Sequence, residues 1–443
     1  MRPKTFRFES FDFSEPKRTV ELRYSLDGTT RFTETFRFDF PFARDFSRAA
    51  LDRALFGLFV AAGVSYYKTF LPPRIILAAN GLAPGQAKFF ETLYEHGLGE
   101  FFYRNRLKPR RPRFPTTGSV TPKPVRLTDL GGGILPIGGG KDSITSAEIL
   151  NSQNQPFATW TVGQSARLAP QLRKIGGKHL AIERQISPEL LRLNRQGAWN
   201  GHVPISMILS FLSVCTAILT KRRDVIWSNE HSANEPNLTY RGLEINHQYS
   251  KSLTAERDFQ DYVRCYVSPD IRYFSLLRPL TELAVAELFG RHFFARFRNN
   301  FSSCNQNFKL HGGQSGLRWC GRCPKCAFVF TILAPFVPRP ELLALFGGRN
   351  LFSAPSLRPT FEAMLGVRGH KPFECIGEIG EVRAAIQLAK RSGQWPELAV
   401  FRFPYSRYNY RRLRNDAMPP EYRRLLDRYL KSHPLTGPAV TVS

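Results

Sequence analysis

The residues best suited by type and spacing to bind a ligand form a glycine-rich loop, Gly138-Gly139-Gly140-Lys141-Asp142-Ser143. Consecutive glycines allow the backbone to approach an anion closely, with its N–H groups directed inward. Lys141 adds a mobile cation, Ser143 a hydroxyl group and Asp142 a carboxylate. A carboxylate makes sense in a phosphate-binding loop when a cation bridges it to the phosphate, so Asp142 is expected to hold magnesium. The loop therefore predicts a binding site for ATP and Mg²⁺.

The spacing of this loop differs from two common nucleotide-binding motifs. A Walker A loop has a glycine several residues before its Gly-Lys pair and Ser or Thr directly after the lysine, and Leu135 and Asp142 fail these tests. The dinucleotide-binding fingerprint fails as well. The loop resembles the PP-loop, whose usual form is Ser-Gly-Gly-x-Asp-Ser, with Gly138 in place of the first serine. This resemblance implies transfer of AMP from ATP to a carbonyl or carboxylate oxygen, with release of pyrophosphate.

A second group of reactive side chains is the run Cys320-Gly321-Arg322-Cys323-Pro324-Lys325-Cys326, with Cys304 shortly upstream. Four thiolates suit a closed, tetrahedral zinc site with a structural role. An iron–sulfur cluster stays open as the alternative, although the usual fourth cysteine soon after the run is absent. The odd total of seven cysteines, four of them clustered, argues against a secreted disulfide framework and favours a reducing cytoplasm.

Polar clusters at predicted strand ends and loops supply candidates for acid–base chemistry. Glu230 belongs to one cluster, His247 and Lys251 to another, and His370 and Cys375 to a third. A histidine that titrates near neutral pH can act as an acid or as a base.

Strands that alternate with helices are expected to position these motifs. Strands are predicted at 134–137, 157–162, 179–182, 224–228 and 271–277, and helices at 143–150, 203–220 and 280–289. Such alternation indicates a parallel sheet covered on both faces, which binds ligands outside the carboxyl ends of its strands. The glycine loop ends one strand and Glu230 follows another, so both should open on the same crevice. Pro136 is unusual for a central strand.

Four regions are predicted along the chain, and together they give the fold class. They are an N-terminal α+β domain (1–107), a Pro-rich linker (108–130), a nucleotide-binding domain with the zinc knuckle (131–340) and a helical, basic C-terminal region (341–443). The predicted class is α/β, with a parallel-sheet PP-loop (HUP-like) core, an N-terminal α+β domain and a cysteine-knuckle C-terminal part.

Composition narrows the possible partners. The chain has 443 residues, of which 42% are hydrophobic, and a net charge of +27 that suits nucleic acid, a membrane surface or a polyphosphate ligand. Nucleic acid is the less favoured of these, because no compact Lys/Arg block with interleaved aromatic residues appears outside the C-terminal tail. Residues 203–220 just reach the length of a membrane span, but Pro204 and several hydroxyl side chains favour a buried helix, so no membrane insertion is expected. No apolar signal-peptide core is visible near residue 1, and a cytoplasmic location is expected.

Further strings extend a family resemblance over most of the chain. They are Gly63-Val64-Ser65-Tyr66-Tyr67-Lys68, the glycine loop, Gly197-Ala198-Trp199-Asn200-Gly201-His202, Asn246-His247-Gln248 with Ser250-Lys251, Arg318-Trp319-Cys320-Gly321 and His370-Lys371-Pro372-Phe373-Glu374-Cys375. Together they resemble the UDP-N-acetylmuramoyl-L-alanyl-L-glutamate epimerases of the MurL type, in which the first loop position is also glycine. The resemblance implies ATP-dependent inversion of the terminal L-glutamate of a UDP-muramoyl dipeptide to D-glutamate, for peptidoglycan synthesis.

The implied reaction explains why an isomerase would consume ATP. An α-proton next to a carboxylate is held tightly, because the enolate would place a second charge beside the first. Adenylation removes the carboxylate charge, a base then takes the proton from one face, an acid returns a proton to the other, and water releases AMP. We favour His247 with Lys251 for these roles, with His370 or Cys375 opposite.

Two other functions use the same loop and stay open. An enzyme that adenylates a base of tRNA is supported by the positive charge, but the cysteines form a knuckle rather than a sulfur-relay pair. A deazapurine synthase resembles the order of glycine loop, lone cysteine and knuckle, but leaves residues 1–107 without a role. The partner that the family resemblance implies is a small molecule, the UDP-muramoyl dipeptide.

Overall fold

The computed structural model of the protein describes residues 2–77, 81–117, 123–163, 165–308, 319–404, 407–410, 416–435 and 440–441. Residues 118–122 of the predicted linker and Arg318 of the family strings lie outside the described residues.

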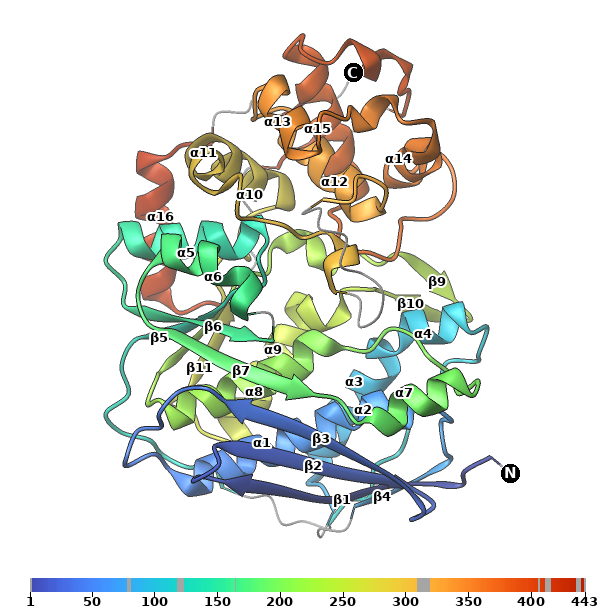
Figure 1. Cartoon of the computed structure of the whole chain (residues 1–443), viewed down its shortest axis with the longest axis vertical. Helices are drawn as coiled ribbons and strands as arrows, with labels where there is room; N and C mark the ends of the chain where they lie inside the picture. The colour runs from blue at the N-terminus through green and yellow to red at the C-terminus, as the bar shows by residue number, and fades with distance from the viewer. Residues whose placement is uncertain are drawn as a thin grey trace.

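A nine-stranded sheet runs through the molecule in the order β11-β8-β5-β6-β7-β3-β2-β1-β4 (Figure 1). From β11 to β7 all neighbours are parallel, which confirms the predicted parallel sheet. The β7–β3, β3–β2 and β2–β1 pairs are antiparallel, and β4 pairs parallel to β1. The strands are β1 (Thr5–Ser14), β2 (Thr19–Leu26), β3 (Thr30–Phe38), β4 (Arg74–Leu77), β5 (Gly133–Pro136), β6 (Phe157–Val162), β7 (His179–Gln185), β8 (Asp224–Trp227) and β11 (Arg272–Ser275).

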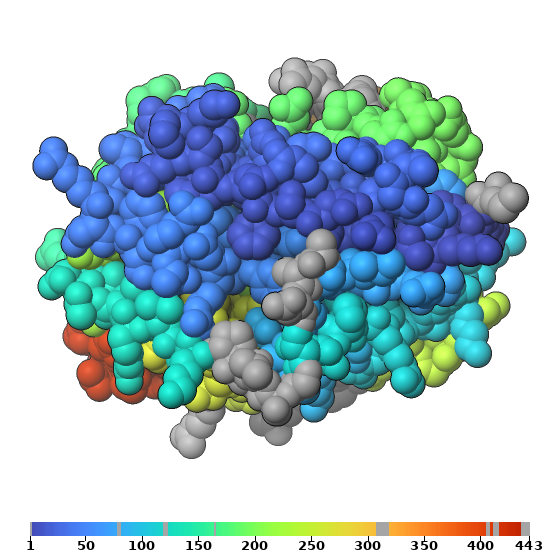
Figure 2. Space-filling model, turned by 90° about the horizontal axis from the view of Figure 1, so that it is seen from below, coloured from blue at the N-terminus to red at the C-terminus, as the bar shows by residue number. Residues whose placement is uncertain are grey.

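The N-terminal strands extend this sheet instead of forming a sheet of their own. Thr35 to Phe38 of β3 pair with Ile182 to Gln185 of β7, so the sheet crosses the boundary expected at residue 107. Figure 2 shows the molecule from below, where the N-terminal residues form a broad band of the surface. The division of the chain into four regions stays a prediction.

Side-chain alternation along the parallel strands creates two cores. Ile134, Val225 and Tyr273 face one core, whereas their neighbours Leu135, Ile226 and Phe274 face the other. The first core packs on α1 (Arg48–Ala62), α3 (Pro84–Gly97), α8 (Ile205–Leu219) and α9 (Leu253–Tyr266). The second packs on α5 (Lys141–Ser152), α6 (Ser165–Ile175), α10 (Glu282–Leu288), α12 (Pro324–Leu333), α15 (Ile379–Arg391) and α16 (Pro420–Ser432). In Figure 1, α12 and α15 lie at the end of the molecule opposite β1–β4.

Pro136 is tolerated in central β5 because of where the strand pairs. The N–H groups of Gly133 and Ile137 donate to β6 and the residue just before it, so the position of Pro136 directs its nitrogen toward β8. The β5–β8 ladder pairs only Gly133 and Ile134, and Pro136 therefore lies beyond the last pair on that side. The missing donor costs no ladder hydrogen bond.

The apolar segment near 203–220 forms α8, a helix of 15 residues buried between the sheet and α1, as predicted. Helix α8 is too short to cross a membrane, and among the described residues one stretch, Arg48–Tyr67, is long and apolar enough by length and composition alone. Of its 18-residue apolar window, 78% is buried inside the protein, as in a core helix.

Candidate active site

The glycine loop connects β5 to the N-terminus of α5, as expected. Gly139 has φ +91°, and a Cβ atom there would lie 2.9 Å from Leu168 Cδ2, so glycine is required for both reasons. Its carbonyl accepts a hydrogen bond from the Ser302 N–H at 2.9 Å. A Cβ on Gly138 would meet nothing within 4 Å, which leaves open the space that a serine fills in the usual PP-loop. The loop presents the N-terminal N–H groups and the positive dipole end of α5 to this space.

Three carboxylates lie together beside this loop, and we call them the acidic cluster: Asp142, Glu230 and Glu282. Oxygens of the three lie within 4.8 Å of one another, from the start of α5, the loop after β8 and the first turn of α10. Burial, and then the Asp142 charge, raise the pKa of Glu230 and raise that of Glu282 to about 7. Carboxylate oxygens that repel one another in this way suit a hard divalent cation such as Mg²⁺.

Two lysines compensate part of this negative charge. Lys141 is buried and forms ion pairs with Asp142 and, at 2.9 Å, with Glu282. Lys325 Nζ lies 3.7 Å from the other oxygen of Glu282. Although burial raises it, these lysines, Lys141 first, hold the pKa of Asp142 below its usual value. Lys141 is thus part of the acidic cluster's charge balance, not an exposed mobile cation.

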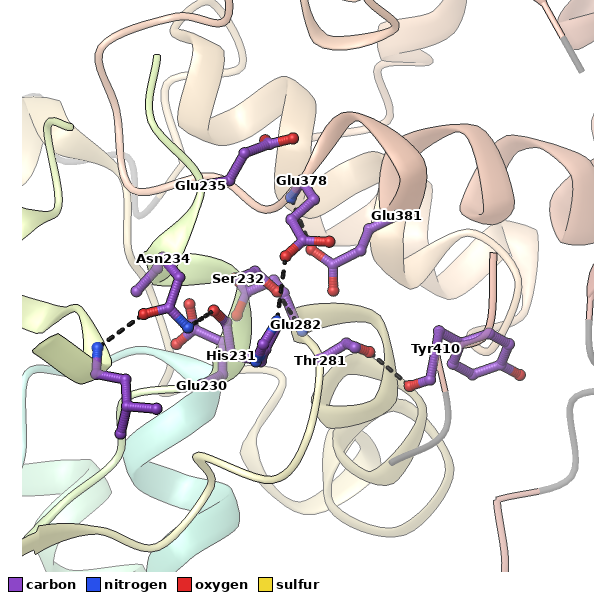
Figure 3. Close-up of polar contacts among 12 residues, drawn as sticks. Glu230, His231, Ser232, Asn234, Glu235, Thr281, Glu282, Glu378, Glu381 and Tyr410 are labelled. Carbon is purple, nitrogen blue, oxygen red and sulfur yellow. Dashed lines mark hydrogen bonds and ion pairs between the residues drawn. The ribbon is translucent and has the colours of Figure 1, made fainter. Parts of the chain in front are cut away.

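The short helix after β8 and the C-terminal helix α15 fix the two glutamates of the acidic cluster (Figure 3). The Ser232 hydroxyl, in the 3₁₀ turn His231–Asn234 after Glu230, accepts a hydrogen bond from the Glu282 N–H at 3.0 Å. His231 Nε2 lies 3.7 Å from Glu378 Oε1 at the N-terminal cap of α15. The C-terminal region therefore supports the site although it supplies neither of these glutamates.

A second polar group, which we call the cysteine–histidine centre, consists of Glu100, His247 and Cys375. Lys251 Nζ donates to Cys375 Sγ at 3.2 Å, and a side-chain hydrogen bond joins His247 to Cys375. His247 Nδ1 lies 2.5 Å from Glu100 Oε2. Burial raises the pKa of Cys375, but Lys251 and His247 outweigh it and lower that pKa to about 5. Burial lowers the pKa of His247, but Cys375 and Glu100 outweigh it and raise that pKa to about 9. A thiolate and an imidazolium therefore face each other at neutral pH.

The acidic cluster and the cysteine–histidine centre meet at Lys251. The charges of Cys375, Glu230 and Asp142 together raise the pKa of the partly buried Lys251 ammonium, against the effect of its burial. Fully buried Arg278 donates to the carbonyl oxygens of Glu230 and Lys251, at 2.6 Å each, and so fixes the two loops side by side. A group bound at the glycine loop would thus lie next to an acid–base centre.

The predicted site residues separate into two groups. The structure brings Glu230, His247, Lys251 and Cys375 together with the loop. His370, by contrast, is exposed, and its ring packs on Tyr103 and Phe373 at 5.7 and 5.4 Å between centroids.

Four residues of the site escaped sequence analysis: Glu100, Glu282, Arg278 and Lys325. The local signal is a lone charged residue within an apolar run: Glu100 lies within Leu98 to Phe102, and Glu282 within Leu280 to Ala286. Such a residue is buried with its run and must find a partner there.

The four predicted cysteine ligands also converge. Sγ atoms of Cys304 and Cys323 lie 4.0 Å apart and those of Cys320 and Cys326 3.7 Å apart, with all four within 4.8 Å. Tetrahedral zinc–thiolate sites have sulfur separations of about 3.8 Å. Backbone N–H groups of Cys320 and Arg322 donate to two of the sulfur atoms. This donor set could bind a metal ion such as zinc.

Comparison with known proteins agrees with this arrangement. Residues 1–276 match the MurL N-terminal domain, and residues 300–417 match the MurL C-terminal domain. The chain belongs to the MurL family. Its similarity extends to proteins named UDP-N-acetyl-alpha-D-muramoyl-L-alanyl-L-glutamate epimerase. That of Xanthomonas oryzae pv. oryzae is 39% identical over 89% of this chain and 88% of the relative, and that of Salinispora tropica is 39% identical over 90% and 88%.

A third relative, from Micromonospora sp., has the same name and is 38% identical over 90% of both chains. The prediction that this MurL protein is an isomerase of the epimerase class is confirmed.

Proposed function

We propose that this MurL protein inverts the terminal L-glutamate of UDP-N-acetylmuramoyl-L-alanyl-L-glutamate to D-glutamate through a carboxyl-adenylate, in peptidoglycan synthesis in the cytoplasm. The substrate follows from the names of its relatives. One observation carries the mechanism: the Lys251 ammonium donates to the sulfur of Cys375, and the charges of Glu230 and Asp142 act on the same ammonium. An ATP-cleaving step and a proton-transfer step can therefore share one bound substrate.

The first half of the reaction uses the glycine loop. Its N–H groups and the N-terminus of α5 bind the phosphates of ATP, while Asp142, with Glu230 and Glu282, would hold Mg²⁺, which shields phosphate charge. A carboxylate oxygen of the substrate attacks the α-phosphorus, the bond to the β-phosphate oxygen breaks, and pyrophosphate leaves. The glutamyl group is then a mixed anhydride with AMP and has lost the charge that opposed deprotonation.

The second half uses the cysteine–histidine centre. The Cys375 thiolate takes the α-proton, so that the C–H bond breaks, an S–H bond forms and the electron pair moves onto the activated carbonyl oxygen. The ammonium of Lys251 and the imidazolium of His247 lie close enough to Cys375 to stabilise negative charge there. A proton returns to the other face of the α-carbon, and water then cleaves the anhydride to release AMP.

The four clustered cysteines act outside this chemistry. Cys304, Cys320, Cys323 and Cys326 would hold zinc with no ligand position left open, so that the metal stabilises the fold at the start of α12.

The decisive experiment incubates purified protein with ATP and UDP-N-acetylmuramoyl-L-alanyl-L-glutamate in deuterated water. We expect AMP and pyrophosphate but no ADP, and D-glutamate product with deuterium at its α-carbon, because the side-chain base exchanges its proton with solvent. Substrate without the terminal glutamate should not support ATP cleavage.

Two results would reject this proposal. D-Glutamate product without deuterium would exclude simple proton abstraction. Pyrophosphate release that requires tRNA and ignores the dipeptide would instead assign the glycine loop to RNA modification.

A further inference from the structure

The carboxylate of Glu100 reaches the cysteine–histidine centre from the N-terminal part of the chain. Glu100 lies in the first turn of α4 (Gly99–Arg104), which packs against β10 (Leu243–Ile245), just before His247. The side chain is buried, and its two oxygens have different partners. Oε1 pairs with Arg104 of the same helix, while Oε2 lies 2.5 Å from His247 Nδ1 and 3.6 Å from His202 Nδ1.

We propose that Glu100 is a positioning residue of the epimerase reaction, which orients the His247 ring toward Cys375. The proposal rests on the proposed function for the identity of the reaction but not for the geometry. A carboxylate on one nitrogen of an imidazole fixes the ring orientation and stabilises the imidazolium. Glu100 therefore acts through His247 without touching the substrate.

The other charged groups at the centre define what Glu100 adds. Lys251 donates to the Cys375 sulfur and Lys325 to its carbonyl oxygen, and both favour the thiolate. Glu374 opposes it, but burial raises the pKa of this carboxyl group to about 7. His202 stays neutral near pH 7, because burial, with the His247 charge, lowers its pKa to about 3. Of the two histidines described here, only His247 is charged near pH 7 and so stabilises the Cys375 thiolate, and Glu100 is the carboxylate that pairs with it.

Thiol titration tests this role directly in the full-length protein. Cys375 is partly exposed, so its alkylation by iodoacetamide can be followed across pH by peptide mass spectrometry. In the wild type we expect similar rates at about pH 6 and about pH 8, because the thiolate is present at both. In Glu100→Gln the rate at about pH 6 should fall roughly tenfold relative to that at about pH 8, because only the thiolate reacts. We expect kcat to fall about tenfold as well, with an unchanged KM for ATP.

The matched control is Glu95→Gln. Glu95 lies on the neighbouring helix α3 and its carboxylate pairs with Arg111, so this variant should change neither measurement. An unchanged alkylation profile in a folded Glu100→Gln variant would overturn the proposal, whatever the substrate proves to be. Should that variant not fold, nitrogen NMR of labelled histidine in the wild type replaces it. A His247 ring that is neutral at about pH 7 would overturn the proposal equally.

A second, independent observation concerns Lys68, a buried lysine without a carboxylate partner. Its side chain is 3% exposed, and Nζ donates to Asn200 Oδ1 at 3.3 Å. Among the described residues no carboxylate lies within ion-pair distance of this ammonium. Arg184 shows the usual solution, because its largely buried guanidinium pairs with the fully buried Glu34 at 2.6 Å. Burial of an ammonium without a counter-charge is costly, and here burial lowers the pKa of Lys68 to about 8.

The position of Lys68 indicates where an anion would complete the pair. Its partner Asn200 is exposed, and the Asn200 carbonyl accepts a hydrogen bond from Asn105 Nδ2 directly after α4. The same loop continues to His202, 3.6 Å from Glu100. We infer that Lys68 and Asn200 form a subsite for an anionic oxygen of the substrate, either a carboxylate or a phosphate, beside the cysteine–histidine centre. This inference also rests on the proposed function.

Calorimetry with four probes identifies the anion: the UDP-muramoyl dipeptide, its two forms with either glutamate carboxylate converted to an amide, and UDP. Lys68→Met should weaken dipeptide binding roughly tenfold to a hundredfold, the value of a hydrogen bond to a charged group. The amide form that lacks the partner carboxylate should bind wild type and Lys68→Met equally, since the interaction is already lost. If instead UDP loses affinity, the partner is a phosphate.

Lys88→Met, which removes an exposed lysine of α3, is the control and should bind every probe normally. If a folded Lys68→Met variant binds each of the four probes with the same affinity as the wild type, the inference is overturned. Protection of Lys68 from amine-modifying reagents by the dipeptide, measured in the wild type, provides a test that does not depend on the variant. Absence of protection despite binding would equally reject the subsite.

Discussion

Two sets of cysteines in this MurL protein have the same thiol group and opposite surroundings. Cys304, Cys320, Cys323 and Cys326 surround one another, with sulfur separations of 3.7 and 4.0 Å for two pairs and backbone N–H groups as hydrogen-bond donors. Cys375 faces the side chains of Lys251 and His247 instead.

The difference shows how surroundings decide the chemistry of a thiol. Sulfur atoms that crowd together can all be thiolates only when a metal ion compensates their charge, and four thiolates leave that ion no open position. A thiolate compensated by side-chain cations keeps its lone pairs free and can take up a proton. We therefore expect the clustered cysteines to stabilise the fold and Cys375 to act in the reaction.

Cys323→Ala should have the broadest effect, because it is expected to disturb the fold of the whole protein and not one step of the reaction. The clustered cysteines then lose one metal ligand at the N-terminus of α12, and soluble protein should fall roughly tenfold or more because metal binding and folding are coupled. Elemental analysis of the wild type should give about one zinc per chain. Soluble, fully active Cys323→Ala protein would remove the distinction between the two sets. If the wild type contained iron and absorbed visible light, the site would be an iron–sulfur cluster and not a zinc site.

Cys375→Ser should give the opposite pattern: folded, metal-containing protein with little epimerase activity. A serine hydroxyl is a far weaker base, so inversion and α-deuterium incorporation should fall on the order of a thousandfold. Part of the dipeptide-dependent pyrophosphate release should persist, because the acidic cluster is intact. Cys265→Ser on α9 serves as the control. Normal deuterium incorporation in Cys375→Ser would exclude Cys375 as the base.

Asp142→Asn should separate the ATP step from both sets of thiols. Loss of one charge from the acidic cluster should lower pyrophosphate release on the order of a hundredfold, with normal folding and metal content. Inversion should fall in parallel, in contrast to Cys375→Ser. The exposed carboxylate Asp261, changed to Asn, is the control. Near-normal turnover would remove Asp142 from the mechanism.

The smallest effect expected is the pH dependence of the Cys375–His247 pair. The pKa of Cys375 is lowered to about 5, so the thiolate and its contribution to stability are lost as pH falls through that value. The pKa of His247 is raised to about 9, so the imidazolium and its contribution are lost as pH rises through that value. Activity should be level between these limits and fall about tenfold per pH unit outside them. A single limb near pH 7 would contradict the charged pair.

The fold could be predicted from the sequence where side-chain alternation and turn residues determine it locally. The alternation along β1 to β3, and the short apolar strands after residue 131, follow from which positions face a core. The extension of the parallel sheet by β3 could not be predicted from the sequence. Pairing between strands far apart in the chain, such as Phe36 with Arg184, produces no pattern in the residues of either strand.

The sequence by itself determined the glycine loop and the spacing of the clustered cysteines. In the loop, Gly139 has a left-handed backbone conformation that glycine adopts far more easily than other residues. It also placed His247, Lys251 and Cys375 among the acid–base candidates. Only the tertiary structure decided that Glu100 meets His247 across 147 residues of chain, that Glu282 completes the acidic cluster, and that His370 stays at the surface. The physical reason is that a side chain's charge state depends on its burial and on the charges around it, and neighbours in space are set by packing between distant segments.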